Sequence, residues 1–120
     1  MSEANVERAR RGYEAVQRGD FETVREFLDP DVKWHGGNPA DGCQDRKQAL
    51  AWMQRAGQRG PLGELVDVIG AGDRVVVIMR RTADDGEPEL VANLTTFRDG
   101  KVVEMVHYPN PDDARAAAGL

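Results

Sequence analysis

The spacing of apolar residues changes once along this chain, near Leu62. Before that point apolar residues recur every three or four positions, which is typical of helices that bury one face. After it they alternate with polar residues, which is typical of strands. When helices come first and are followed by strands joined by short turns, the helices pack against one face of the sheet that the strands form. The chain is therefore predicted to form an α+β fold.

Three helices are predicted in the first half of the chain. The first covers residues 4–18 and ends at Gly19, which suits the left-handed position after a helix. Asp20 is a good N-cap for a short second helix that stops before Pro30. The third follows Asp45, where the sequence is close to a capping box. The apolar face of the first helix consists of Val6, Ala9, Tyr13 and Val16.

Five strands and a last helix complete the expected order. The helix begins at Asn110, with Pro111 at its first position. Connections in the second half are short, so neighbouring strands there are expected to be antiparallel. The predicted strands are Asp31–His35, Leu62–Ile69, Val75–Thr82, Glu89–Phe97 and Val102–Tyr108.

Length and charge narrow the range of functions. The 120 residues suit one domain, residues 1–120, and the formal charge of −5 argues against nucleic acid as a partner. No apolar run has the length of a secretory signal or a membrane span, so we expect a cytoplasmic protein that does not bind membranes. The chain has one cysteine, Cys43, and two histidines. We therefore expect no metal site and no cofactor.

Four segments in this order resemble SnoaL-like proteins of the nuclear transport factor 2-like superfamily. They are Val6–Val24, Phe27–Trp34, Gly72–Val75 and Phe97–Glu104. The resemblance implies a cone-shaped half-barrel, with a curved, mostly antiparallel sheet and N-terminal helices packed on its concave face. It also implies an apolar pocket and frequent dimers. Members include polyketide cyclases, ketosteroid isomerases, epoxide hydrolases, dehydratases and proteins without catalysis, so the reaction has to be argued from the pocket residues.

Two reactions of the superfamily are disfavoured by the residues present. The tyrosine and aspartate of a ketosteroid isomerase align with Gly12 and Gly36, and Tyr13 lies about 100° around the helix from the required position. An epoxide hydrolase of the limonene type needs an Asp-Arg-Asp trio. Here Arg81 is the one matching residue, and His107 replaces the last aspartate.

His107 is the strongest catalytic candidate. Glu104 marks the solvent side of the last strand, so alternation places Met105 and His107 in the pocket. Superfamily members with a catalytic acid on this strand carry it at this position. An imidazole with a pKa near 6.5 suits proton transfer, and without an inward carboxylate nearby the ring is expected to be neutral at pH 7. The alternative is a pocket-wall histidine without catalysis.

The sequence allows either face of the sheet for three other polar residues, His35, Asn93 and Thr95. Trp34 is expected in the pocket wall with His35 on the loop side, and the alternative places His35 opposite His107. A three-residue loop with a bulge after Phe97 turns Asn93 and Thr95 inward, pairing Asn93 with Met105 and Val91 with His107. A two-residue turn at Asp99-Gly100 turns Asn93 and Thr95 outward instead. We favour the bulged register.

Arg81 is expected to face the same cavity, with a rim position as the alternative. Cys43 is interpreted as an inert thiol. The predicted ligand pocket comprises the apolar side chains of Trp34, Trp52, Met53, Met79 and Met105, together with His35 and Thr95.

These residues suggest a small-molecule pocket protein for an apolar, ring-containing metabolite. As a cofactor-independent cyclase, isomerase, dehydratase or hydrolase it would use His107 as acid/base, with Asn93 or Arg81 polarising an oxygen. The alternative is a non-catalytic ligand-binding or dimerisation module. A homodimer is expected, because Val91, Val106 and Tyr108 would otherwise expose an apolar patch on the outer sheet face.

Overall fold

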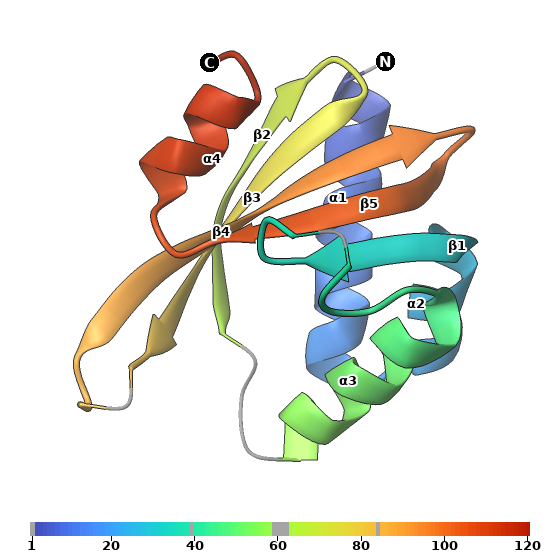
Figure 1. The fold of residues 1–120 in the computed structure, drawn as a ribbon, viewed down its shortest axis with the longest axis horizontal. Helices are drawn as coiled ribbons and strands as arrows, with labels where there is room; N and C mark the ends of the chain where they lie inside the picture. The colour runs from blue at the N-terminus through green and yellow to red at the C-terminus, as the bar shows by residue number, and fades with distance from the viewer. Residues whose placement is uncertain (1, 39, 59–62, 84) are drawn as a thin grey trace.

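The computed structural model describes residues 2–38, 40–58, 63–83 and 85–120, and it has the predicted α+β fold (Figure 1). The start of the strand expected at Leu62 lies outside the described residues. The helices are α1 (Ser2–Arg18), α2 (Phe21–Phe27), α3 (Arg46–Gln58) and α4 (Pro111–Ala117). The strands are β1 (Leu28–His35), β2 (Glu64–Ala71), β3 (Arg74–Thr82), β4 (Pro88–Arg98) and β5 (Lys101–Tyr108).

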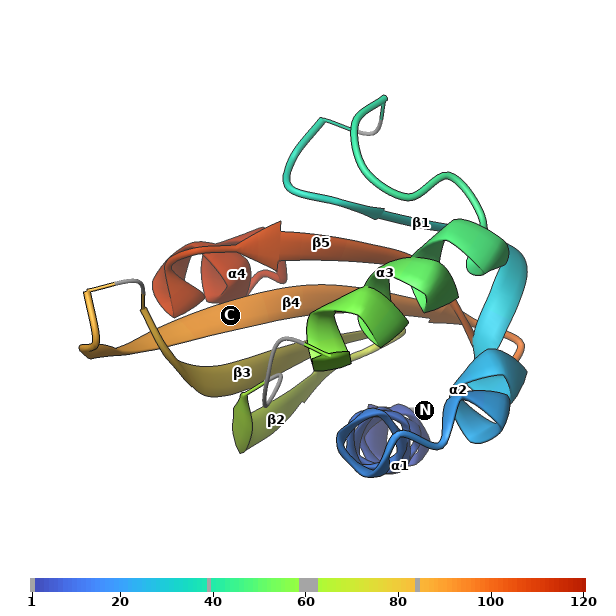
Figure 2. The same ribbon diagram turned by 90° about the horizontal axis from the view of Figure 1, so that it is seen from below.

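The five strands form one curved sheet in the order β1-β5-β4-β3-β2. Strands β2 to β5 are antiparallel neighbours, and β1 runs parallel to β5. Helices α1, α2 and α3 lie on the concave side, as Figure 2 shows. This arrangement confirms the half-barrel predicted from the resemblance.

Local capping interactions set the helix ends. Gly19 has a φ of 75°, a backbone conformation that is strained for any residue with a side chain. The chain then continues through Asp20 into α2. The Asp20 carboxylate accepts a hydrogen bond from the Thr23 backbone N–H at 3.3 Å. Asn110 caps α4 in the same way, accepting from the Asp112 N–H at 2.9 Å. These contacts explain why the helix boundaries are close to those predicted.

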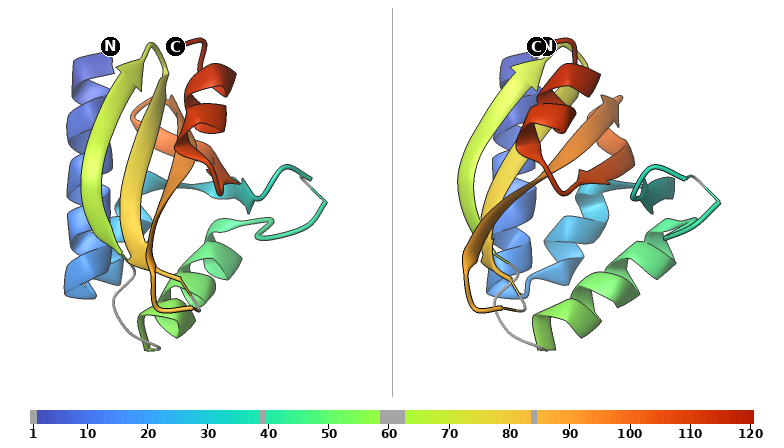
Figure 3. Two further views of the ribbon diagram at one scale, coloured as in Figure 1. Left: turned by 90° about the vertical axis from the view of Figure 1, so that its left-hand side faces the viewer. Right: turned by 60° about the vertical axis from the view of Figure 1, so that its left-hand side comes forward.

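The sheet buries side chains on both faces. The concave face packs against α1 to α3, and α4 lies over the convex face (Figure 3). A second apolar cluster lies beneath α4. Ala114 of α4 is fully buried in this second cluster, and Tyr108 packs beside it. Val91, expected on the outer face, is instead 2% exposed and lines the concave side. The apolar patch expected to drive dimerisation is therefore partly covered by the chain's own last helix.

The β4–β5 hairpin differs from both predicted registers. Its turn has two residues, Asp99 and Gly100, with positive φ values of 54° and 79° that suit an Asp-Gly turn. A bulge then leaves Val103 unpaired between the Phe97–Val102 and Thr96–Glu104 partners. From the bulge onward, the strand residues that face each side of the sheet are exchanged relative to regular pairing.

As a result Asn93 and Thr95 point into the concave side of the sheet, as the favoured register predicts. Their partners on β5 differ from the predicted ones. Asn93 pairs with His107 and Thr95 with Met105. The expected pairing of Val91 with His107 is wrong, because the extra residue lies within β5 and not in the turn.

We predict that α4 contributes to stability by covering the convex face. Replacing Ala114 with Asp places a carboxylate in a fully buried site, and should lower the free energy of unfolding by about 2 kcal/mol or more. The matched control is Ala116→Asp on the exposed side of α4, expected to cost less than about 1 kcal/mol. Urea unfolding of both variants measures the difference. Equal losses would contradict the packing of α4 described above.

Candidate functional site

A cavity of about 440 Å³ lies between the concave face of the sheet and helices α1 to α3. Its apolar lining comes from α1, α2, α3 and four strands, and one group of polar side chains projects from α1, β4 and β5. No described Asp or Glu lines it, although the chain contains 21 acidic residues. The lining of the cavity includes Tyr13, Trp34, Trp52, Arg81, Asn93, Thr95 and His107.

A chain of hydrogen bonds connects three of the cavity residues. The Asn93 amide Nδ2 donates to the Tyr13 hydroxyl at 2.8 Å. The Asn93 Oδ1 lies 3.3 Å from Nδ1 of His107. Asn93 is 2% exposed, so both ends of its amide are satisfied inside the protein by groups from α1 and β5.

This chain determines the proton positions on His107. Because Nδ2 of Asn93 donates to Tyr13, the amide oxygen faces His107 and can only accept. The Nδ1 atom of His107 therefore carries a hydrogen. In the neutral ring, Nε2 then has a free lone pair, and no described residue hydrogen-bonds to it.

Burial and a nearby cation keep the His107 ring neutral. Desolvation lowers the pKa of His107 below its ordinary 6.5, and the Arg81 guanidinium lowers it further, while Glu89 acts in the opposite direction. This direction agrees with the neutral ring expected from the sequence. At pH 7 the cavity therefore contains an imidazole that is able to accept a proton.

Two hydroxyl groups lie beside Asn93. Burial raises the pKa of Tyr13 to about 12, against the opposing effects of Asn93 and Thr95, so the phenol stays protonated at neutral pH. Thr95 is 2% exposed, and its Oγ1 has no hydrogen-bond partner among the described residues. It lies close enough to Tyr13 to affect that pKa, but the two hydroxyls do not meet the geometry of a hydrogen bond.

Arg81 lies at the rim of the cavity. Its Nε donates to Glu89 on the neighbouring strand at 2.7 Å, and its side chain is 47% exposed. This is the rim position that was the alternative in the sequence analysis. An exposed ion pair of this kind contributes little to stability. The effect of Arg81 on the site is electrostatic, because its positive charge lowers the pKa of His107.

Aromatic and sulfur-containing side chains form the cavity wall at α3. The rings of Trp34 and Trp52 meet edge to face, with centroids 4.7 Å apart and planes at 69°. Trp52 is 46% exposed at this wall, while Met53 and Met105 are buried. Burial raises the pKa of the Cys43 thiol, which keeps it protonated at neutral pH.

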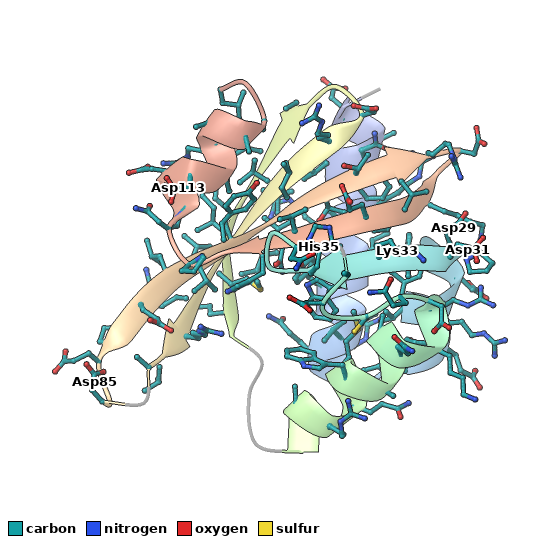
Figure 4. All side chains as sticks on the ribbon, in the orientation of Figure 1. Asp29, Asp31, Lys33, His35, Asp85 and Asp113 are labelled. Carbon is teal, nitrogen blue, oxygen red and sulfur yellow. The ribbon has the colours of Figure 1, made fainter. Side chains whose placement is uncertain are left out.

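His35 borders the cavity, but its ring is turned away from His107. Its Nδ1 accepts a hydrogen bond from the Gly37 backbone N–H, and Nε2 lies 3.1 Å from the Glu104 carboxylate. Glu104 pairs with Thr96, on the face opposite to Asn93 and Thr95. Figure 4 labels His35 at the end of β1, where it links the following loop to the sheet. The structure thus favours the loop-side placement and not the pairing with His107.

Tyr13 is a cavity residue that reasoning from the sequence did not assign to the site. Comparison with ketosteroid isomerases placed it one position away from the expected tyrosine. Its position on the apolar face of α1, together with Val6, Ala9 and Val16, was the signal that it points toward the sheet.

The part of the chain that the structure describes meets the requirements of neither a metal site nor a membrane-spanning helix. It contains no group of three or more His, Cys, Asp or Glu residues that could hold a metal ion. None of its helices is long and apolar enough to cross a membrane.

Known structures share this architecture. Bal32a, from a soil-derived mobile gene cassette, is 28% identical over 89% of both chains, with a TM-score of 0.74. An NTF2-like protein of unknown function from Mesorhizobium loti is 29% identical over 89% of this chain and 91% of its own, with a TM-score of 0.73. A loop-truncated variant of IdmH is 29% identical over 79% and 84% of the two chains, with a TM-score of 0.61. No match is found among curated proteins.

The curved sheet, the helices on its concave face and the cavity between them define an NTF2-like protein. The SnoaL-like domain family matches residues 9–105. The chain belongs to the SnoaL-like family.

We predict that His107 makes the protein less stable in acid. Below pH about 6.5, His107 binds a proton in the unfolded chain but stays neutral in the folded protein, because folding lowers its pKa. The free energy of unfolding therefore falls as the pH falls. Above that pH the ring is neutral in both states and contributes no slope. Urea unfolding between pH about 7 and about 5.5 should show a smaller loss of stability in His107→Gln than in the unsubstituted protein. Identical slopes would contradict the lowered pKa.

Proposed function

We propose that the cavity binds a small, ring-containing organic molecule and that His107 moves a proton on it without a cofactor. The observation that carries this proposal is the orientation of Asn93. Its Oδ1 fixes the hydrogen of His107 on Nδ1, which leaves the lone pair of Nε2 free as a base.

The apolar lining supports the choice of ligand. A cavity of about 440 Å³ accommodates a molecule of a few fused rings, and Trp34 and Trp52 offer aromatic surface for it. A ligand that fills this apolar lining would displace water from it, which would strengthen its polar contacts with the cavity.

His107 is able to act in two steps on such a ligand. Nε2 first accepts a proton from a carbon or oxygen atom of the ligand, and the electron pair stays on the ligand. Asn93 then faces an imidazolium, whose Nδ1–H it stabilises through its carbonyl oxygen. The proton returns to the same or another atom of the ligand, which is the common step of isomerisation, dehydration and cyclisation.

The second candidate is a ligand-binding module without catalysis. It is favoured by the absence of acidic side chains from the described lining, because many proton transfers use a carboxylate together with a base. Binding alone would need the apolar wall but not a titrating group.

We predict that the protein accelerates hydrogen exchange on 2-tetralone, a small bicyclic ketone with a weakly acidic C–H next to its carbonyl. In D₂O, His107 would remove that hydrogen to form the enolate, and the same carbon would then take up deuterium. The loss of the proton signal by NMR measures the rate. His107→Gln should lower the protein-dependent rate about 100-fold or more, because a general base contributes roughly two to four powers of ten.

Binding of 2-tetralone, followed by quenching of tryptophan fluorescence, separates the two candidates. The Gln variant should bind within about twofold of the unsubstituted protein, since the amide keeps volume and hydrogen bonding. His35→Gln serves as the control for the loss of a histidine, and should keep the exchange rate. Binding without accelerated exchange would contradict catalysis and leave the binding module. Absence of binding would contradict both candidates.

We also propose that the protein is a homodimer that pairs through the convex face of the sheet. The exposed Leu90 and the half-buried Val106 leave apolar surface there beside α4. Sedimentation velocity at tens of micromolar should give a dimer, and Leu90→Glu should shift it toward monomer. A monomer in the unsubstituted protein would contradict the proposal.

A further inference from the structure

Two hydroxyl protons in the wall of the cavity have no acceptor among the described residues. The Tyr13 oxygen accepts a hydrogen bond from Asn93, so its own hydrogen is directed elsewhere. The Thr95 Oγ1 lies near the Tyr13 hydroxyl but makes no hydrogen bond of good geometry in the described part of the chain, although Thr95 is 2% exposed. Both residues line the same cavity.

An unpartnered buried hydroxyl is costly in a folded protein. It has lost its hydrogen bonds to water without gaining others, and the few such groups in native structures call for a bound partner or a role. Valine would fill the Thr95 site with almost the same shape and without this cost. The presence of threonine therefore points to a group that binds there.

The kind of group follows from what the two hydroxyls offer. Each has a hydrogen to donate, and the Tyr13 oxygen is already occupied by the Asn93 amide. A carbonyl oxygen has two lone pairs and no hydrogen of its own, so it is able to accept from both. A carboxylate fits less well than a neutral carbonyl, because the two described arginines that line the cavity already have partners, Arg81 in Glu89 and Arg8 in the Asn5 side chain.

Position along the strand relates this group to His107. Thr95 is the next inward residue after Asn93 on β4, and Asn93 lies directly opposite His107. Two residues of a strand span about 7 Å. A ligand whose carbonyl oxygen binds at Thr95 is therefore able to bring the carbon next to that carbonyl within reach of His107.

We propose that Tyr13 and Thr95 together bind a carbonyl oxygen of the ligand, and that the ligand is a ketone with hydrogen on the adjacent carbon. The inference rests on the proposed function, since it assumes that the cavity binds a ligand next to His107. It assigns Thr95 as a residue that determines specificity, through a contact that the free protein leaves unmade.

The test compares 2-tetralone with tetralin, which has the same two rings and no carbonyl. Affinities are measured by quenching of tryptophan fluorescence, because Trp34 and Trp52 both line the cavity. The unsubstituted protein should bind 2-tetralone about three to ten times more tightly than tetralin, the amount expected for one or two net hydrogen bonds. Thr95→Val should abolish most of this preference and leave the affinity for tetralin unchanged.

Thr96→Val is the matched control, because Thr96 is the next residue on β4 and faces the other side of the sheet. It should keep the full preference for the ketone. Tyr13→Phe is the second variant, and should also reduce the preference while retaining the aromatic ring.

Two further readouts separate a binding role of Thr95 from a structural one. Thr95→Val should raise the midpoint of thermal unfolding of the free protein, because it removes a buried group without a partner; a threonine needed for folding would give a lower midpoint. With 2-tetralone labelled with carbon-13 at its carbonyl, the bound signal should move toward its value in apolar solvent in the variant.

The outcomes distinguish this inference from the proposed function. If neither compound binds, the proposed function itself fails. If both bind equally to the unsubstituted protein, or if Thr95→Val keeps the preference, the carbonyl site is overturned and the ligand cavity stands.

Discussion

The hydrogen bonds that Asn93 makes to Tyr13 and His107 depend on three separate elements of the chain, α1, β4 and β5. A buried amide without partners would destabilise the fold, so the helix and both strands have to meet at this residue. The same contacts orient the amide and thereby the imidazole. One side chain thus couples the packing of α1 on the sheet to the chemistry available in the cavity.

That coupling requires a particular register in the β4–β5 hairpin. The hairpin has a two-residue turn at Asp99-Gly100, which in regular pairing would place Asn93 on the convex face. The bulge at Val103 shifts the pairing by one residue and brings Asn93 opposite His107. Bulges often occur beside functional sites, where they redirect side chains. Here the bulge decides which face carries the polar groups.

Much of the fold could be predicted because short-range chemistry controls it. Asp20 and Asn110 cap their helices through contacts within three residues, and alternating apolar residues define the strands. The bulge has no comparable signal, since a valine within a strand looks like its neighbours. The outward placement of Val91 failed for the same reason, and the covering of the convex face by α4 depends on a contact between distant segments. The family resemblance identified His107, but it led away from Tyr13, whose role follows from its contact with Asn93.

The central claim is that Asn93 holds the hydrogen of His107 on Nδ1, and long-range proton–nitrogen NMR of the ring tests it most directly. At pH 7 the two ring nitrogens of a single tautomer have well-separated shifts, which identify the atom that carries the hydrogen. The structure predicts a hydrogen on Nδ1 and a bare Nε2, and predicts that Asn93→Ala lets the two tautomers mix. A ring with its hydrogen on Nε2, or one that Asn93→Ala leaves unchanged, would contradict the account.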